Sequence, residues 1–460
     1  MDGLQGDTIA SALHANDVRI LTRSLKYDNP RGFFCGIGKC SSCLMRVNGI
    51  PNVRTCIAPL NEGVNVEMQD KLADLPSADF KSKSTKKMVF DILIVGAGPA
   101  GLCASIEAAN QGASVLLVDE NLQIGGQLIK QTHKFFGSKQ EKAGTRGIQI
   151  AKDLGEKIRG YQKNGKICLM LNSTVIGFYD GKKGFHKSAV VKREDYDSAL
   201  FEIECKAVIF ACGAMENMLL FPGNDLPGVY GAGAVQTLMN VFGVKPGNRV
   251  LMVGAGNVGL IVSYQLLQAG IMVDRVVEAA PVIGGYNVHA AKLRRCGVPI
   301  QTSYSVKEVY GEDKVEGAII IKLDEKWQPV KGSEEKIKCD TVCLAVGLTP
   351  STRLLAQVGV NLEFIPEAGG FIALHDKSMK TTVEGIYVAG DSSGIEEAST
   401  AMLEGKIAGV SAAFQIGYDK NIKTLKKRYL KELERLRAGP FGDKSRKAKD
   451  KIQKLLGKTK

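Results

Sequence analysis

A glycine motif, G-x-G-x-x-G, occurs twice in this chain, each time between a run typical of a buried strand and a run typical of a helix. The six glycines are Gly96, Gly98 and Gly101 in the first copy and Gly254, Gly256 and Gly259 in the second. In such a loop the first glycine makes the turn, the second lets the backbone approach a pyrophosphate, and the third lets the helix pack closely on the strand. The repeat therefore predicts an α/β chain with two nucleotide-binding halves of the Rossmann type.

Each half continues from its helix into a second strand that ends at an acidic residue. The first strand ends at Asp119, with Glu120 as the alternative, and the second ends at Glu278. A carboxylate at this position accepts hydrogen bonds from the ribose hydroxyls of a bound dinucleotide and repels the 2′-phosphate of NADP. At the second half we therefore expect NAD rather than NADP. An adenine nucleotide without hydride chemistry and an empty site are the alternatives.

Four of the eleven cysteines lie close together near the N-terminus, and the other seven are scattered. The four are Cys35, Cys40, Cys43 and Cys56, with the spacing C-x4-C-x2-C-x12-C. The first three have the spacing of plant-type ferredoxins, whose four thiolates bind a [2Fe–2S] cluster, and Gly36 and Gly38 let the loop curl around it. Zinc sites usually show two short Cys pairs, and only one is present. We therefore expect a [2Fe–2S] cluster in a ferredoxin-like α+β domain, with zinc or unliganded thiols as the alternatives.

The order of these features divides the chain into six segments. A ferredoxin-like domain is expected over residues 1–70, and a polar, Lys- and Ser-rich linker over residues 71–88. The other segments are the first part of one nucleotide-binding domain (89–225), an inserted second nucleotide-binding domain (226–348), the rest of the first domain (349–417) and a basic helical tail (418–460).

Positive charge is concentrated at the C-terminus. The segment from Asp419 onward holds 16 Lys and Arg against 5 Asp and Glu, and so carries +11 of the chain's formal net charge of +13. The rest of the chain is nearly neutral, and the tail has no base-reading motif. Both observations argue against a nucleic-acid partner. Apolar residues at helical spacing predict a docked helix that stops at Ala438-Gly439-Pro440. We expect a frayed, solvated Lys-rich end after it; the alternative is an electrostatic dock for an acidic redox partner.

The same sequence indicates a compartment. The first residues show no basic region followed by an apolar stretch, so no secretory signal is expected. Residues 250–273 carry no charge, but their glycines and amides suit a strand, loop and helix better than a transmembrane span. An odd number of cysteines with one tight cluster favours a reducing environment. We therefore expect a cytoplasmic protein without a transmembrane segment.

Two further motifs give the first half a resemblance to the two-dinucleotide flavoproteins. Gly125-Gly126-Gln127 follows the acidic strand end, and Gly390-Asp391 follows a strand-like run over residues 386–389. The resemblance implies a bound FAD, with the Gly-Gly-Gln triplet near the flavin and Asp391 on its ribityl or phosphate segment. The insertion of the second glycine motif into the first domain is also this family's layout. The dithiol of the disulfide reductases, a C-x2-C or C-x4-C pair, is missing beside both motifs.

Three other stretches make the resemblance more specific. They are residues 221–229 (FPGNDLPGV) with 213–216 (GAME), and the sequences SLKY (24–27) and PRG (30–32) before the first clustered cysteine. With them, the order of parts up to about Gly417 is similar to that of the α subunits of heteromeric FAD-dependent amino-acid and amine dehydrogenases. This group includes sarcosine oxidase, the proline and hydroxyproline dehydrogenases, opine oxidases and hydrogen cyanide synthase.

This resemblance implies that the amine is oxidised on a second flavin in another subunit, and that this chain accepts or relays the electrons. In some members the second nucleotide site holds ATP. The chain lacks the folate-type C-terminal domain of sarcosine oxidase α and the second cysteine cluster that some relatives carry after the Gly-Asp motif. Iron–sulfur modules of this kind normally open with a β-hairpin, and this chain starts part-way into one. Either the first strand is missing, or a partner covers the exposed edge.

Three functions follow as hypotheses. The first is an electron-transferring FAD and [2Fe–2S] subunit of a heteromeric amino-acid or amine dehydrogenase, whose partner is a second flavoprotein subunit. The second is a self-sufficient NADH-dependent iron–sulfur flavoprotein reductase. The third is a non-catalytic nucleotide-binding scaffold. The sequence favours the first, an FAD-dependent oxidoreductase, because the chain contains no evident substrate domain and the redox chemistry belongs to the cofactors.

Overall fold

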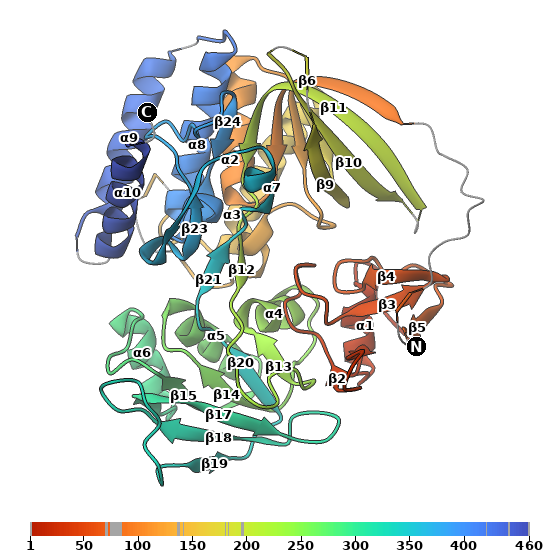
Figure 1. Cartoon of the computed structure of the whole chain (residues 1–460), viewed down its shortest axis with the longest axis vertical. Coiled ribbons are helices and arrows are strands. Elements are labelled where there is room, and N and C mark those ends of the chain that lie inside the picture. The colour runs from red at the N-terminus through yellow and green to blue at the C-terminus, as the bar shows by residue number, and fades with distance from the viewer. Residues whose placement is uncertain are drawn as a thin grey trace. The chain divides into compact units, whose positions relative to one another are not determined.

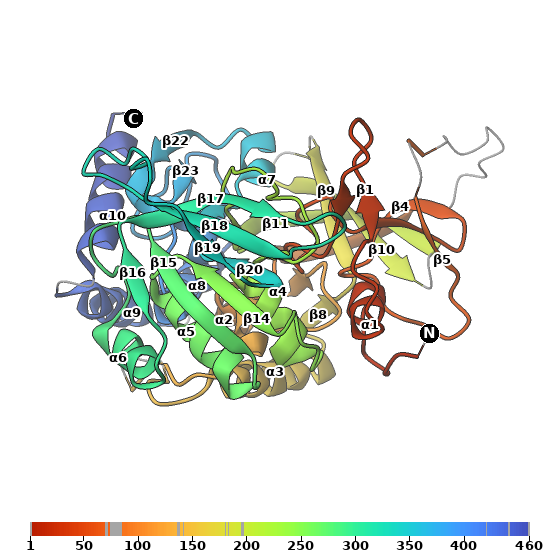
Figure 2. The same cartoon turned by 90° about the horizontal axis from the view of Figure 1, so that it is seen from below.

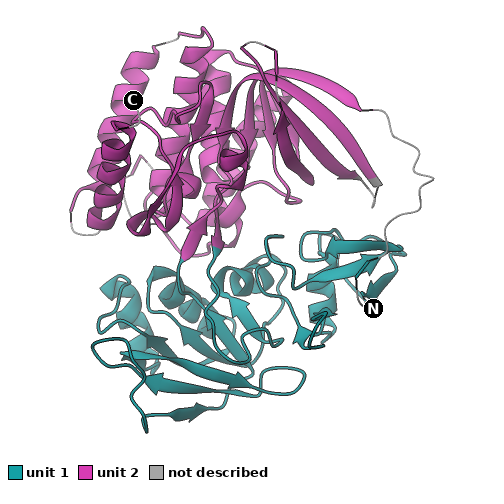
Figure 3. Cartoon of the chain, viewed as in Figure 1, with its two compact units in different colours: residues 1–80, 216–347 teal, residues 81–215, 348–460 magenta. Residues whose placement is uncertain are grey.

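The computed structural model describes residues 2–69, 72–73, 85–135, 139–140, 142–179, 181–182, 184–194, 197–419, 421–439 and 442–458. The chain forms two compact units, and each is built from two stretches that are far apart in sequence (Figures 1 and 3). Unit 1 contains residues 1–80 and 216–347, and unit 2 contains residues 81–215 and 348–460. No helix in the described part of the chain combines the length and apolar character that crossing a membrane requires.

Unit 2 is organised around a mostly parallel sheet of seven strands. The order is β8-β7-β6-β11-β10-β9, and β24 also pairs with β11. Ile92, Leu93 and Ile94 of β6 are fully buried, as expected where a parallel sheet is covered on both faces. The seven strands are β6 (Lys86–Val95), β7 (Val115–Val118), β8 (Ile167–Met170), β9 (Ser173–Tyr179), β10 (His186–Glu194), β11 (Asp197–Phe210) and β24 (Ile386–Val388).

Three helices of unit 2, α2 (Pro99–Gln111), α8 (Ala398–Gln415) and α9 (Ile422–Arg437), are stacked beside this sheet (Figure 1). A Cβ on Gly405 would lie 2.1 Å from the carbonyl oxygen of Ala100, and one on Gly409 would lie 2.5 Å from that of Ala104. These two glycines therefore let the backbones of α2 and α8 approach closely. The rest of unit 2 comprises η1 (Gly126–Lys130), α3 (Gly147–Lys163), β12 (Ala214–Glu216), β21 (Leu348–Pro350), α7 (Arg353–Gln357), β22 (Leu362–Ile365), η3 (Pro366–Ala368), β23 (Gly370–Ala373), η4 (Gly390–Ser393) and α10 (Asp443–Leu456).

The expectation of a frayed, solvated C-terminal end is wrong, because α10 is a second helix packed on unit 2. Its Ala448, Ile452 and Leu456 recur every four residues, and all three are buried in one cluster with residues of β22, η3 and β23. Charged and polar residues, five of them lysines, occupy all the other positions of α10 except Leu455 and disguise this narrow apolar stripe in the sequence. The first tail helix ends at Arg437, close to the predicted stop; Pro440 itself lies outside the described residues.

The predicted linker over residues 71–88 is described only in part. Residues 71 and 74–84 lie outside the described residues. At its end, Lys86, Lys87 and Met88 already pair with β11 as the beginning of β6. The domain bounds drawn from the sequence stay a prediction.

Unit 1 combines the N-terminal module with the second nucleotide-binding half. The latter is a parallel sheet of five strands in the order β13-β20-β14-β15-β16. Helices α4 to α6 lie on one face of it and the antiparallel sheet β17-β18-β19 on the other (Figures 1 and 2). The elements are β13 (Val229–Gly231), α4 (Ala232–Gln236), η2 (Thr237–Val241), β14 (Arg249–Val253), α5 (Asn257–Gln268), β15 (Met272–Glu278), α6 (Asn287–Arg295), β16 (Ile300–Thr302), β17 (Tyr304–Tyr310), β18 (Gly317–Lys322), β19 (Glu335–Ile337) and β20 (Thr341–Leu344).

The N-terminal module of unit 1 is small and contains one helix beside short strands. A three-stranded sheet has the order β4-β3-β5, and β1 pairs with β2. Its helix begins with a reciprocal cap, because Thr8 accepts from the Ser11 backbone N–H while the Ser11 side chain accepts from the Thr8 N–H. The elements are α1 (Ile9–Ala15), β1 (Thr22–Arg23), β2 (Pro30–Arg31), β3 (Leu44–Val47), β4 (Ile50–Arg54) and β5 (Val66–Met68).

Candidate functional site

The first glycine loop joins β6 to α2 in unit 2. A Cβ on Gly96 would lie 2.3 Å from the carbonyl oxygen of Ala211, and one on Gly101 would lie 1.8 Å from that of Gly96, so neither position accepts a side chain. A Cβ on Gly98 would meet only the Cα of Gly126, at 4.0 Å. Gly98 is also the N-cap of α2, and no side chain of the described residues caps this helix there. An open backbone surface at a helix N-terminus fits a pyrophosphate.

Asp119 fastens the end of β7 to this loop. The backbone N–H of Ala97 donates to its Oδ2 at 2.6 Å, and the backbone and side-chain nitrogens of Asn121 donate to Oδ1 at 2.8 Å. Burial raises the pKa of Asp119, and these hydrogen bonds oppose that shift. Because Oδ2 accepts only from Ala97 and keeps a second lone pair, Asp119 can still accept from a ribose hydroxyl through that oxygen. Its neighbour Glu120, the alternative, is less buried.

Two sequence-distant segments meet the first turn of α2. A Cβ on Gly126 would lie 2.8 Å from the Cα of Gly98, and Gly125 N–H donates to the carbonyl of Ala97 at 2.8 Å. Gly390 has a φ of +69°, and a Cβ there would lie 2.9 Å from the Cβ of Ala100. The structure thus brings the first loop, Gly125-Gly126 and Gly390 together, as residues around one bound nucleotide would be.

The two polar residues that follow these glycines differ in their surroundings. Gln127 is exposed at the start of η1. Asp391 lies in η4, where burial, together with the nearby carboxylates of Glu404 and Glu396, raises its pKa to about 7. Burial removes much of the water around the Asp391 carboxyl group, so a polar group of a ligand would take the place of that water.

The second glycine loop, in unit 1, repeats the first. A Cβ on Gly254 would lie 2.3 Å from the carbonyl oxygen of Ala345, and one on Gly259 would lie 2.0 Å from that of Gly254, whereas a Cβ on Gly256 meets nothing within 4 Å. Glu278 is equivalent to Asp119, because it accepts hydrogen bonds from the Ala255 N–H at 2.7 Å and from the Ala280 N–H at 2.9 Å. The second loop therefore offers the same open backbone surface as the first.

Sequence reasoning missed a glycine pair at the second loop. Gly284-Gly285 follows Glu278 much as Gly125-Gly126 follows Asp119, and a Cβ on Gly285 would lie 2.9 Å from the carbonyl carbon of Gly256. The Gly285 N–H donates to the Ala255 carbonyl at 2.9 Å, and Tyr286 N–H donates to Asn257 Oδ1 at 2.8 Å. The Ile-Gly-Gly sequence common to both pairs was the available signal.

The four clustered cysteines converge in the N-terminal module. Cys35, Cys43 and Cys56 are buried and Cys40 is partly exposed. Cys40 N–H donates to Cys35 Sγ at 3.4 Å, and Thr55, next to Cys56, donates through its hydroxyl to the Cys43 carbonyl at 2.8 Å. The loop of the first three and the return strand thus bring all four sulfur atoms to one place.

The thiols are close enough to share hydrogen bonds with one another. Contacts with Cys40 and Cys56 lower the pKa of Cys35, and a contact with Cys56 lowers that of Cys43. The same contacts, with burial, raise the pKa of Cys40 and of Cys56. In the described residues no three His, Cys, Asp or Glu side chains form a group for a single metal ion. Four convergent thiolates are the donor set of a two-iron cluster, which takes two at each iron.

The cysteine module packs on the second nucleotide-binding half within unit 1. Gly231 N–H of β13 donates to the carbonyl of Phe34 at 3.0 Å, and Phe34 and Cys35 belong to one buried cluster with residues of β13, β14 and β20. His14 of α1 adds a buried contact, because its Nε2 lies 3.3 Å from the hydroxyl of Tyr230. Cys35 therefore lies at the base of the module, against the second half.

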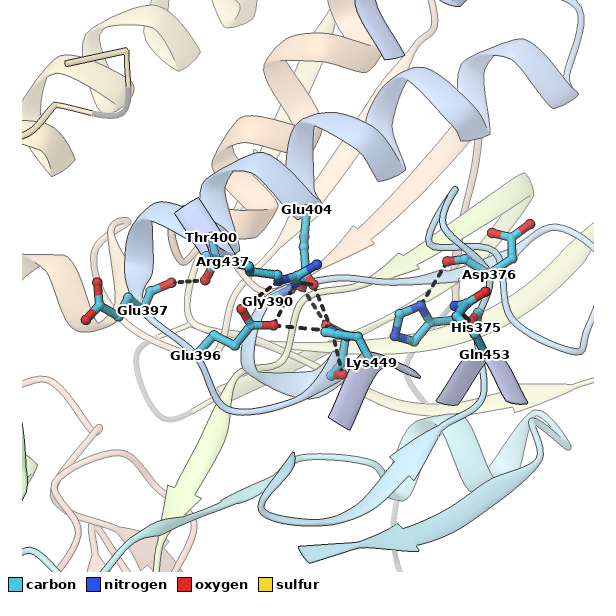
Figure 4. A network of polar contacts seen from close by, with 11 residues as sticks. His375, Asp376, Gly390, Glu396, Glu397, Thr400, Glu404, Arg437, Lys449 and Gln453 are labelled. Atoms are coloured by element: carbon cyan, nitrogen blue, oxygen red, sulfur yellow. Dashed lines mark hydrogen bonds and ion pairs between the residues drawn. The ribbon is translucent and has the colours of Figure 1, made fainter. Parts of the chain in front are cut away.

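A buried ionic cluster that sequence reasoning also missed lies next to Gly390. Glu404 of α8 accepts from the Gly390 N–H at 3.0 Å and pairs with Arg437 and Lys449 of the C-terminal helices (Figure 4). Although burial opposes it, these two cations hold the pKa of Glu404 at about 2. No residue spacing reveals this cluster, because its members are brought together only by packing.

Known families match both parts of the chain. Residues 90–405 match the family described as pyridine nucleotide-disulphide oxidoreductase, and residues 1–71 match the 2Fe-2S iron-sulfur cluster binding domain. The first match spans more than half of the chain. Both agree with the fold class expected from the glycine loops and the cysteines, which is thereby confirmed.

Individual relatives extend this result. The alpha subunit of sarcosine oxidase from Rhizobium meliloti (strain 1021) is 25% identical, over 91% of this chain and 45% of its own length. One of the subunits of opine oxidase from Agrobacterium tumefaciens (strain Ach5) is 28% identical, over 70% of this chain and 65% of its own. The solved L-proline dehydrogenase from P. horikoshii has a TM-score of 0.71 and 26% identity, covering 93% of this chain and 74% of that one.

The chain therefore spans about half to two thirds of the length of these two oxidase subunits. Their names confirm the resemblance to subunits of heteromeric amino-acid and amine oxidases and dehydrogenases. The chain belongs to the pyridine nucleotide-disulphide oxidoreductase family, as a flavoprotein-type oxidoreductase with an N-terminal 2Fe-2S cluster binding domain.

Proposed function

We propose that this chain is the electron-transferring FAD and [2Fe–2S] subunit of a heteromeric amino-acid or amine dehydrogenase. The observation that carries the proposal is the presence, in one chain, of an open glycine-loop surface ringed by Gly126 and Gly390 and of four convergent thiols. When bound, FAD exchanges electrons in pairs and the cluster one at a time. A chain equipped for both suits electron relay.

Each chain element has a part in this proposal. Gly98 and the N-terminus of α2 would receive the FAD pyrophosphate, and Asp119 would accept from the ribose hydroxyls. Asp391 would bind the ribityl or phosphate segment. The cluster would be held by Cys35, Cys40, Cys43 and Cys56. The substrate would be oxidised in a second flavoprotein subunit, which the naming of the relatives as subunits supports.

The test begins with the visible spectrum of the purified chain, together with its iron, sulfide and FAD content. Flavin and iron–sulfur bands are expected, and a colourless protein would exclude the proposal in favour of a nucleotide-binding scaffold. The chain is then mixed anaerobically with sarcosine, proline or an opine, with and without a candidate partner chain. Bleaching of the flavin that requires the partner supports the proposal, and full-rate oxidation by the chain alone contradicts it.

A second function, an NADH-dependent iron–sulfur flavoprotein reductase, is favoured by one observation. The second loop is as complete as the first, with an open Gly256 and with Glu278 fastened to Ala255. Stopped-flow mixing with NADH separates the two functions, because the reductase requires rapid bleaching of the flavin by NADH alone. Calorimetric titrations with NAD, NADH and ATP identify the nucleotide of the second site.

The cationic face of α9 supports a further partner. Lys423, Lys426, Lys427 and Lys431 line one surface hollow with Leu430 and Glu434. We propose that this face attracts an acidic redox protein, since such encounters are steered by complementary charge. The rate at which this chain reduces an acidic acceptor protein should then fall steeply as the ionic strength rises. A rate that does not depend on salt would contradict a role of the α9 face in attracting the acceptor.

A further inference from the structure

The two C-terminal helices are part of the core of unit 2. Ile422, Tyr429 and Leu433 of α9 are buried in the same cluster as α2 and α8, and α10 is buried against β22 and β23. Gln453 of α10 also donates to the backbone carbonyl of His375 at 2.8 Å. The tail is therefore fixed beside the loop that runs from Gly390 to Glu397.

Each helix directs one cation into this loop. Arg437, at the end of α9, binds Glu396 through Nε at 2.9 Å and through a terminal nitrogen at 2.7 Å, and it reaches Glu404 at 2.6 Å. Lys449 of α10 lies 2.8 Å from Glu404 and 3.6 Å from Glu396. The side chains of Glu404 and Glu396 are 3% and 8% exposed. Those of Arg437 and Lys449 are 14% and 12% exposed. Two cations thus neutralise two carboxylates away from water (Figure 4).

The other side of this cluster is the backbone next to Asp391. Glu404 Oε2 accepts from Gly390 N–H at 3.0 Å and from the Ser393 hydroxyl at 2.5 Å. Lys449 Nζ donates to the carbonyl oxygen and to the hydroxyl of the same serine, each at 2.9 Å. One carboxylate therefore connects the C-terminal cations to the turn that carries Gly390 and Asp391.

We propose that Glu404, held by Arg437 and Lys449, is a positioning residue for the flavin, and that the C-terminal helix pair is therefore part of the flavin site. The proposal rests on the proposed function, because it needs FAD at the first glycine loop. The geometry explains the role of Glu404. Gly390 lies so close to Ala100 of α2 that a Cβ on it would be 2.9 Å from the Ala100 Cβ, and the hydrogen bond from the Gly390 N–H to Glu404 fixes the turn at this position. Loss of a cation leaves Glu404 buried without full compensation, and the turn moves to hydrate it.

The test compares variants of residues inside the buried cluster with variants of exposed cations on the two C-terminal helices. Arg437→Gln breaks the buried cluster, and Glu404→Gln keeps the shape but cannot pair with both cations. The matched controls are Arg435→Gln on α9 and Lys451→Gln on α10, whose side chains are 69% and 51% exposed and which pair with Glu432 and Glu367. Arg437→Lys keeps the positive charge but loses the two-nitrogen contact with Glu396, and Ser393→Ala weakens the connection without unpairing a charge.

The readout is the rate of FAD release from the intact holoprotein, followed as recovered flavin fluorescence after dilution, with the visible circular dichroism of the bound flavin. We expect release about tenfold faster in Arg437→Gln and Glu404→Gln, the effect of losing one buried charge-assisted hydrogen bond. Ser393→Ala is expected to release FAD about threefold faster, and the exposed controls to stay within about twofold of the original. Arg437→Lys should lie between Arg437→Gln and the original, because it keeps the charge but not the two-nitrogen contact. Because the substitutions lie in unit 2 and the clustered cysteines in unit 1, folding of each variant is checked by far-ultraviolet circular dichroism and urea denaturation rather than by the iron–sulfur absorbance.

Each result is decisive. If the original chain binds FAD and folded Glu404→Gln releases it at the original rate with an unchanged flavin dichroism, the inference is wrong while the proposed function stands. If Glu404→Gln and Arg437→Gln lose the far-ultraviolet circular dichroism of a folded protein, Ser393→Ala decides the question by the same measurement of FAD release. A chain that binds no FAD in its original form defeats the proposed function itself. If the exposed controls Arg435→Gln and Lys451→Gln accelerate FAD release as much as the cluster variants do, the effect is a general one of charge and the inference is wrong.

Discussion

The first glycine loop allows a substitution that separates folding from cofactor binding. Gly98 has φ −75° and ψ −175°, extended backbone that alanine adopts freely, and a Cβ there would meet only the Gly126 Cα at 4.0 Å. Gly98→Ala should therefore leave the free energy of unfolding of the cofactor-free protein unchanged or raise it by about 0.4–1 kcal/mol, because it restricts the unfolded chain. The new methyl group, however, would occupy the surface assigned to the FAD pyrophosphate.

The loss of flavin affinity can be estimated from the contacts at stake. Displacing the pyrophosphate would forfeit about two charge-assisted hydrogen bonds from backbone N–H groups, at roughly 1.5 kcal/mol each. The sum, about 3 kcal/mol, corresponds to a dissociation constant more than a hundredfold larger. Gly101→Ala is the contrasting variant, because its Cβ would lie 1.8 Å from the Gly96 carbonyl oxygen. Moving α2 to relieve that clash should lower the stability of the protein by about 3 kcal/mol.

Two measurements check this pair. Urea denaturation of the cofactor-free proteins, followed by far-ultraviolet circular dichroism, gives the free energies of unfolding. Titration with FAD, followed by flavin fluorescence quenching, gives the dissociation constants. A Gly98→Ala variant that binds FAD with the original affinity would refute the placement of the pyrophosphate. A Gly98→Ala variant as unstable as Gly101→Ala would refute the claim that this face of the loop is open.

Three further predictions concern unit 1. Cys43→Ser should abolish the iron–sulfur absorbance and reduce iron from about two atoms per chain to nearly none, whereas Cys205→Ser, in β11 of unit 2, should leave both unchanged in the same iron assay. Gly256→Ala should weaken NAD or ATP binding at the second site by about a hundredfold in calorimetric titration while flavin content stays constant, and a parallel loss of flavin would contradict two separate sites. Burial, with Arg19, lowers the pKa of His14 to about 3. The free energy of unfolding should therefore be full above pH 6.5 and fall below it by up to about 1.4 kcal/mol per pH unit, because only the unfolded chain binds the proton there. Urea unfolding at pH 7.5 and pH 5 should show that slope, and His14→Asn should remove it.

The sequence alone was sufficient for features whose chemistry is local. A glycine loop is recognisable because three glycines at fixed spacing meet three steric demands, and the structure meets them at both copies, down to the equivalent hydrogen bonds of Asp119 and Glu278. The four clustered cysteines were recognisable as candidate ligands for the same reason, since one short loop supplies three of them, and their role as ligands stays a prediction. For Gly390-Asp391, the resemblance to a known family implied only a place beside the flavin, and the close approach of Gly390 to Ala100 of α2 is a finding of the structure.

The features that escaped prediction are those created by packing. Glu404 stands in an apolar helix, Arg437 and Lys449 stand among many surface-type cations, and nothing in their spacing says that they meet. The helix α10 was missed because its buried stripe contains only one residue per turn, Ala448, Ile452 and Leu456, and all but one of its other positions are charged or polar. Formal charge per segment cannot distinguish a solvated lysine from one that is almost fully buried.

This distinction changes the meaning of the basic tail. Counted along the sequence, a nearly neutral body carries an appendage of +11. In the structure, Arg437 and Lys449 neutralise Glu396 and Glu404 of the body, so a buried carboxylate pair that would be prohibitively costly alone becomes compatible with folding. The tail therefore has two kinds of cation. Those on the outer face of α9 contribute to the positive field at its surface, whereas the two inner ones complete the domain that carries the first glycine loop. Removing the tail should for this reason alter unit 2 itself, in addition to the charge on its surface.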